Sequence, residues 1–295
     1  MKETVIKLGL CMVALISVAV LFTVVAYIFL NGMQVISLDF LLKSPNYAAL
    51  EKGGIFPQII GSLCLLSVCL LFAVPLGMAS GIYLAEYAPE NIITKSVRFF
   101  VECLAGIPSI VIGLFGLIFL VYYLGFGPSM LAGGLSLGFM ILPWTVRASE
   151  EAIKAVPRSY REASLALGAS KWQSIRSVVL KSAYPGIITG ILLGAGKALG
   201  EAAVILLTTG GLVTYIPHSL LDDVGALPVY IYMILTVVPA SRDVAESYAF
   251  GASLVLITMF LMISVFALFL RNRYVKETIG GEKEKGIYRR ERKVR

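Results

Sequence analysis

The sequence predicts an all-α, polytopic membrane protein with six transmembrane helices and both termini in the cytoplasm. Hydrophobic residues make up 58% of the 295 residues and charged residues only 15%, whereas typical soluble domains have about 45–50% apolar and about 25% charged residues. Long stretches carry no charge, and the basic residues gather between these stretches. The composition excludes a soluble enzyme, and the high apolar content excludes a disordered chain.

The uncharged stretches locate the membrane spans. A helix needs about 20 residues to cross a hydrocarbon core of roughly 30 Å. The uncharged run 103–146 is about twice as long as one crossing requires, so we expect Gly125, Gly127 and Pro128 to divide it into a helical hairpin. The apolar run 226–240 is too short to cross and is predicted to be a re-entrant or interfacial helix. The six predicted spans cover residues 8–30, 58–84, 101–124, 129–147, 185–207 and 247–270.

The basic residues assign the two sides of the membrane. Of the 25 lysines and arginines, 21 fall in the N-terminal tip 1–7, the connection after the second span, the connection 148–184 with its borders, and the tail 271–295. Six spans put these segments on one side, and an excess of Lys and Arg marks the cytoplasmic side. The net charge of +7 is therefore explained without nucleic acid, and the basic tail is expected to contact anionic membrane lipid.

Residue patterns for catalysis or metal binding are missing from the sequence. The four cysteines lie in apolar stretches without C-x-x-C spacing, and we interpret them as small buried hydrophobic side chains. The chain has one histidine and no G-x-x-x-x-G-K-S/T motif for nucleotide phosphates. We therefore expect no catalytic residue, no metal and no cofactor in this chain, and we expect any ATP to be bound by a partner subunit.

The connection 148–184 has the pattern of two short helices. Pro157 ends the helix that leaves the fourth span, and Ser159 with Glu162 three residues later forms a capping-box pattern. The predicted helix 160–167 ends at Gly168, a residue type that favours helix C-termini. A second amphipathic helix is predicted over 171–182. A short helix that is fixed at both ends can pass a domain motion to the spans on either side.

Several local motifs carry a family resemblance. Glu162-Ala163-Ser164, with Gly168 six residues after Glu162, matches the EAA loop of ABC importer permeases, although Lys181 stands where that pattern continues with proline. Further motifs are GGIFP at 53–57, IYLAEYAP at 82–89, GIPSIV at 106–111, VPRSYREAS at 156–164 and ALPVYIY at 226–232. Together they resemble the phosphate-specific ABC importer permeases, and within these the A-type subunit.

The resemblance implies an ABC type I importer permease fold for the transmembrane domain 8–270. The chain would form half of a phosphate path in the cell membrane of a bacterium or archaeon, and Glu162, Ala163 and Gly168 would couple it to an ATPase. The implied partners are an ABC ATPase dimer, a homologous C-type permease and an extracytoplasmic phosphate-binding protein. The alternatives are an ABC permease for another oxyanion, and an ATP-independent channel or secondary carrier.

Lys197 and Glu201 are the two charges deep within a predicted span. Each costs roughly 2.5–3.5 kcal/mol at a helix centre, and their spacing of four residues predicts one shared helical face. Several glycines around them would let another helix or an aqueous path come close. The two charges either lock helix packing or guide phosphate. In the resembled family an Arg–Glu pair at this place is linked to transport, and Lys197 keeps the charge of that Arg without its bidentate fork.

Overall fold

The computed structural model describes the backbone of residues 2–291 and the side chains of residues 6–273. Within these residues the chain consists of helices, turns and loops, which confirms the predicted all-α fold class. Five helices are long and apolar enough to cross a membrane, and a bent pair of helices brings the number to six if it counts as one span. Most of the basic tail at 271–295 lies outside the described side chains, so its contact with lipid stays a prediction.

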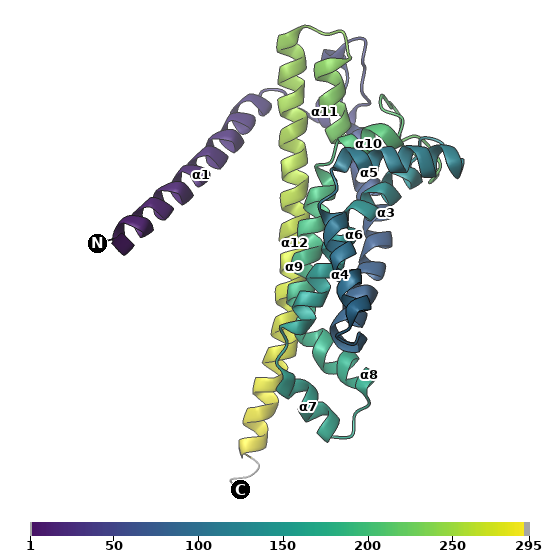
Figure 1. Ribbon diagram of the computed structural model, residues 1–295. Coiled ribbons are helices and arrows are strands. Elements are labelled where there is room, and N and C mark those ends of the chain that lie inside the picture. The colour runs from purple at the N-terminus through teal and green to yellow at the C-terminus, as the bar shows by residue number, and fades with distance from the viewer. Residues whose placement is uncertain (1, 292–295) are drawn as a thin grey trace.

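Four of the predicted spans coincide with single long helices. α1 extends away from the bundle (Figure 1), and Tyr27 near its end packs edge-on against Phe250 with ring centroids 5.4 Å apart. None of the residues in the most apolar stretch of α1 is buried against the rest of the chain, so lipid or another subunit must cover it. The four helices are α1 (Lys2–Gly32), α3 (Phe56–Ile82), α6 (Met130–Lys154) and α12 (Arg242–Glu291).

The third predicted span, 101–124, is wrong as a straight helix. α4 (Ile92–Ala105) and the helix formed by α5 (Ser109–Phe115) and the π-helical η3 (Gly116–Tyr123) meet at an angle of 99°. Pro108 lies at the bend. It has no N–H to continue a helix, and its ring keeps the preceding residue out of the helical region. Because this bend carries no charge, the length of the uncharged run could not reveal it.

The fifth span begins and ends earlier than the predicted 185–207. The helix runs without interruption through α8 (Lys171–Ser174), the π-helical η4 (Ile175–Val179) and α9 (Leu180–Leu199). The predicted end of the second cytoplasmic helix at residue 182 is therefore wrong, because Pro185 lies inside α9 and membrane helices tolerate proline. A break at 200–202 separates α9 from the short helix α10 (Ala203–Thr208).

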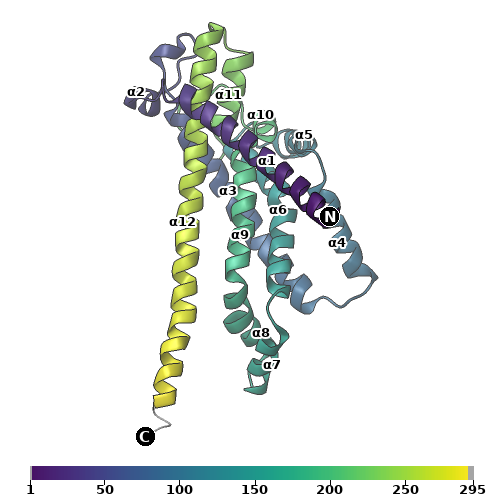
Figure 2. The same cartoon turned by 90° about the vertical axis from the view of Figure 1, so that its left-hand side faces the viewer.

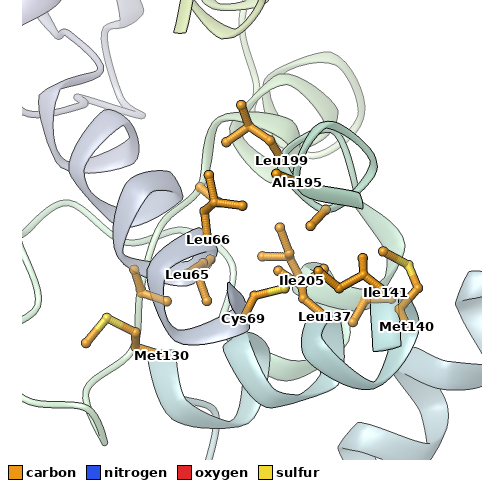
Figure 3. Packing of buried hydrophobic residues seen from close by; sticks show 14 of the residues in the cluster. Leu65, Leu66, Cys69, Met130, Leu137, Met140, Ile141, Ala195, Leu199 and Ile205 are labelled. Carbon is orange, nitrogen blue, oxygen red and sulfur yellow. The ribbon is translucent and has the colours of Figure 1, made fainter. Parts of the chain in front are cut away.

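The core of the bundle lies between α3, α6 and α9. α3 and α6 pack at close range, since a Cβ atom added at Gly81 would lie 2.5 Å from the Cβ of Ser149. Cys69 is buried in this core as predicted, whereas Cys11 and Cys103 are exposed on the single chain, so the prediction is wrong for these two. Figure 3 shows the apolar cluster, which includes Leu65, Leu66, Leu137, Ile141, Ala195, Leu199 and Ile205.

Short elements close the two ends of the bundle. α2 (Leu38–Leu42), η1 (Leu50–Lys52) and α11 (Leu227–Thr236) share one apolar cluster at one end. α7 (Arg158–Ala166) and α8 lie at the other end, towards which the C-terminal part of α12 also runs (Figures 1 and 2). α11 has ten residues and is too short to cross, as expected for the apolar run 226–240.

Candidate functional site

Lys197 and Glu201 do not share a helical face. α9 ends at Leu199, and Glu201 lies in the break before α10. The prediction of one continuous helix is wrong here because Gly200, a poor helix former, occupies the end of α9. The carboxylate Oε1 of Glu201 accepts a hydrogen bond of 3.2 Å from the backbone N–H of Ala203. Glu201 therefore caps the first turn of α10, where a negative charge is stabilised by the helix dipole.

Lys197 lies against an aromatic ring. Its Nζ is 4.9 Å from the centroid of the Trp144 ring on α6, a distance at which a cation is attracted to the ring face. Among the residues whose side chains are described, Lys197 has no ion-pair partner, and it is exposed on the single chain. No sequence pattern indicated this contact, because Trp144 is 53 residues away in the chain. From sequence alone, Trp144 is interpreted as an aromatic anchor at the membrane interface.

Arg147 adds a second cation to the same region. It follows Trp144 by three residues on α6, so the two side chains lie on the same side of the helix. Its guanidinium pairs with Glu102 of α4 at 3.3 Å and with Glu151 at 2.9 Å. Lys197, Trp144 and Arg147 are all exposed on the single chain. A charged face of this kind is too costly to leave in lipid, so another subunit or an aqueous path must cover it.

The connection 148–184 folds into two helices joined by a glycine turn. α7 ends at Ala166, and Gly168 has a φ of +85°, the left-handed conformation that favours glycine. The predicted helix end at Gly168 is therefore confirmed. The predicted capping box of Ser159 and Glu162 is wrong, because α7 begins directly after Pro157, whose fixed φ starts the helix earlier. The capping box is instead at the start of α8, between Ser170 and Gln173.

Several large apolar and aromatic side chains are exposed on the surface of this connection. Leu167 is 89% exposed, and Tyr160, Leu165 and Trp172 are about half exposed. Glu162, Ala163 and Gly168 are also exposed and lie among them on α7 and its following turn. Figure 1 shows α7 and α8 projecting at the end of the bundle towards which the C-terminal part of α12 also runs. Exposed apolar patches on a projecting segment are typical of protein–protein contact surfaces.

Ion pairs connect the helices at this end of the bundle. Arg98 of α4 donates from Nε to Glu150 of α6 at 2.7 Å and from Nη1 to Glu90 at 2.9 Å. Glu150 also pairs with Lys154 at 2.6 Å. The hydrogen bond and the positive charge of Arg98 hold the pKa of Glu90 below its ordinary value. These contacts join α4 and α6, so the charges here fix the relative position of helices.

Comparisons with known proteins agree with this architecture. The family described as "Binding-protein-dependent transport system inner membrane component" matches residues 73–271. A probable ABC transporter permease protein of Bacillus subtilis is 37% identical over 283 residues, which cover 91% of this chain and 94% of that protein. A probable phosphate transport system permease protein of Methanocaldococcus jannaschii is 38% identical over 216 residues, covering 73% and 75%.

A solved structure shows the same fold. The bacterial alginate ABC transporter, in complex with its alginate pentasaccharide-bound periplasmic protein, contains a chain that superimposes with a TM-score of 0.62. The match covers 87% of this chain and 90% of the alginate transporter chain, at 17% sequence identity. At that identity the likeness concerns the fold alone.

Proposed function

This chain belongs to the family of binding-protein-dependent transport system inner membrane components, and from that premise we propose that it is the permease subunit of an ATP-driven phosphate importer. Membership makes it a multi-pass membrane subunit of an ABC importer. The choice of phosphate is supported by the relative from Methanocaldococcus jannaschii, whose name describes a phosphate transport system. It is also supported by the chemistry around Lys197.

Lys197 is the observation that carries the proposal. Its ammonium group lies on an exposed face of an apolar helix and contacts the Trp144 ring, and among the described side chains it has no carboxylate partner. A cation held in this way remains available to an anion, and phosphate oxygens accept charge-assisted hydrogen bonds from lysine. Glu201 follows in the adjacent break and could accept the hydroxyl proton that phosphate still carries. The pair would guide phosphate midway along its path.

A second subunit completes the path in this proposal. The exposed face that carries Lys197 and Arg147 is the face that we assign to a homologous C-type permease, so that the two subunits enclose an aqueous path. An extracytoplasmic phosphate-binding protein would deliver the anion to the end of the bundle formed by α2 and α11. The termini and the connection 148–184 would lie in the cytoplasm, as the distribution of basic residues predicts.

In this proposal the energy of ATP hydrolysis reaches the chain through partner subunits that dock at α7. The exposed apolar side chains of α7 and its turn, together with Glu162, Ala163 and Gly168, would dock on an ABC ATPase dimer. ATP binding would draw the two ATPase subunits together and move α7, which would switch the path between inward-facing and outward-facing states. Hydrolysis would then reset the path.

Transport by the reconstituted complex tests the substrate. We would purify the chain with its ATPase, second permease and binding protein, and measure ATP-dependent uptake of radiolabelled phosphate into proteoliposomes. Phosphate uptake that exceeds uptake of sulfate, molybdate and phosphonate is expected. If one of those oxyanions is taken up in place of phosphate, the assignment of phosphate is wrong and that oxyanion is the substrate. Uptake that needs neither ATP nor the ATPase would favour a channel or secondary carrier.

Co-purification of the ATPase tests the docking surface. Gly168→Pro is expected to abolish co-purification, because proline cannot adopt the φ of +85° that this turn requires. Gly127→Pro is the matched control, since Gly127 also has a left-handed φ, of +67°, but lies in the turn before the opposite end of α6. Loss of the ATPase in both variants, or in neither, would contradict docking at α7.

A further inference from the structure

We infer that Arg161 fastens the coupling helix α7 to the cytoplasmic end of α3, so that the ATPase acts on the second span directly. This inference rests on the proposed function as an ABC importer permease. A short helix in the connection 148–184 would ordinarily be expected to move the two spans that flank it in the sequence, which are α6 and α9. The contacts of Arg161 add a third span, α3, because its partner Glu86 lies 75 residues earlier in the chain, just after α3.

Arg161 joins three elements through one guanidinium group. Its Nε and Nη2 donate to Oε1 of Glu86 at 2.8 and 2.6 Å, and Glu86 belongs to the π-helical turn η2 (Tyr83–Tyr87) that ends the second span. Nη1 also donates to the carbonyl of Val156 at 2.7 Å, and Nη2 to that of Ile153 at 2.9 Å. Ile153 lies in the last turn of α6, and Val156 follows just after the end of that helix. A lysine has no planar fork and could not make this set of bonds.

The Arg161–Glu86 pair is shielded from water. The Glu86 side chain is 9% exposed and the Arg161 side chain 21%. Screening by solvent makes exposed pairs weak, whereas a pair that is mostly buried holds its geometry, and removal of one partner leaves a charge without compensation. The pair is therefore a fixed connection rather than a transient surface contact.

A second contact holds α8 to the same turn. Nζ of Lys171 lies 4.4 Å from the centroid of the Tyr87 ring in η2. The hydroxyl of Ser164 on α7 donates to the hydroxyl of Ser174 on α8, which links the two helices. Both halves of the connection are thus attached to η2, and a displacement of α7 by the ATPase displaces the end of the second span.

The second span passes the displacement to the face that carries the mid-span charges. η2 continues directly from α3, and α3 packs against α6 so closely that a Cβ atom at Gly77 would lie 2.7 Å from the side chain of Thr145. Thr145 is adjacent in sequence to Trp144, which contacts Lys197. A continuous series of packed groups therefore runs from Arg161 to Lys197. This series would shift α3 and α6 together between two positions, and that shift is the two-state change that the ATPase would drive.

The role of Arg161 in coupling is tested by the transport ratio, which is the number of anions moved per ATP hydrolysed. In the reconstituted complex we would compare wild type with Arg161→Met, Glu86→Gln and the double variant. Each single variant is expected to keep the ATPase bound and hydrolysing ATP while the transport ratio falls about tenfold, within the usual range of coupling between linked sites. The double variant is expected to be no worse than either single variant, because both remove the same pair. Arg176→Met is the matched control, since Arg176 is exposed on η4, and its ratio should equal that of wild type.

Three outcomes would overturn the inference: an unchanged ratio in Glu86→Gln, additive losses in the double variant, or loss of the bound ATPase together with transport. If Arg161→Met does not fold, Glu86→Gln decides alone, because it alters the pair without touching the connection. If the wild-type complex moves another oxyanion, the ratio is measured with that anion. The assignment to phosphate can thus fail while the role of Arg161 is still decided.

Discussion

The charges at the end of the bundle formed by α7 and α8 differ from the charges within the membrane in what they contact. Arg161 and Arg98 are each surrounded by carboxylates and carbonyls at 2.6–3.4 Å and are mostly shielded from water. Lys197 contacts an aromatic ring, and Glu201 contacts a backbone N–H. Ion pairs of the first kind fix the positions of helices, whereas a cation without an anionic partner can exchange its contact for an anionic ligand.

This difference predicts two separate kinds of defect. Loss of a charge at the end formed by α7 and α8 should disturb stability or coupling, because another buried charge loses its partner. Loss of a charge within the membrane should disturb transport and leave stability nearly unchanged where the new side chain keeps the remaining hydrogen bonds, since no ion pair breaks. Measuring stability and transport in the same variants therefore tests whether one group of charges fixes helix positions and the other acts in transport.

The largest stability effect is expected for Arg98→Met. The Glu150 side chain is only 10% exposed, and it would keep Lys154 as a partner but lose Arg98. We expect a loss of about 3 kcal/mol in the free energy of unfolding, at the lower end for removal of one partner of a buried pair. The measurement is the thermal unfolding midpoint of the purified complex.

Arg242→Met provides the control for Arg98→Met. Arg242 also forms an ion pair, with Glu246 at 2.6 Å, but its side chain is 90% exposed. Exposed pairs of this kind contribute about 0–1 kcal/mol, so the midpoint should hardly change. Equal shifts in the two variants would show that burial does not separate the two kinds of ion pair.

The sequence was sufficient for most of the fold because charge spacing reports directly on contact with lipid. It failed where the backbone breaks inside a predicted span, at the bend of Pro108 and at Gly200. Rules based on the length of uncharged runs cannot detect such breaks. The prediction of one helical face for Lys197 and Glu201 failed for the same reason, since it assumed that the helix continues beyond Gly200.

The candidate site was only partly accessible from sequence. The individual charges and the exposed EAA-type loop could be found because polar residues stand out against apolar spans. Their partners could not be found, since Arg161 meets Glu86 and Lys197 meets Trp144 across long separations in the chain. Such contacts depend on how the helices pack, and helix packing is set by glycine and apolar surfaces whose pairing no local motif encodes.

Lys197→Met is expected to give the largest transport effect without a stability effect. Losing a charge-assisted contact to phosphate should reduce uptake by about 30-fold, which corresponds to about 2 kcal/mol. Lys197→Arg is the control, because it keeps the positive charge and should stay within a few-fold of wild type. Wild-type uptake in Lys197→Met would remove Lys197 from the phosphate path, and a lowered unfolding midpoint would assign it to helix packing instead.

Glu201→Gln separates the two roles that remain open for Glu201, with the smallest expected effect. The amide oxygen of Gln can still accept the hydrogen bond from the N–H of Ala203, so the cap of α10 and the stability should be kept. The negative charge is lost, and a neutral acceptor forms a weaker hydrogen bond to the hydroxyl of phosphate than a carboxylate does, so uptake should fall about fivefold. Glu201→Ala should in addition lower stability by about 1 kcal/mol, since it removes the cap. Full uptake in Glu201→Gln together with reduced stability in Glu201→Ala would leave Glu201 as a capping residue alone.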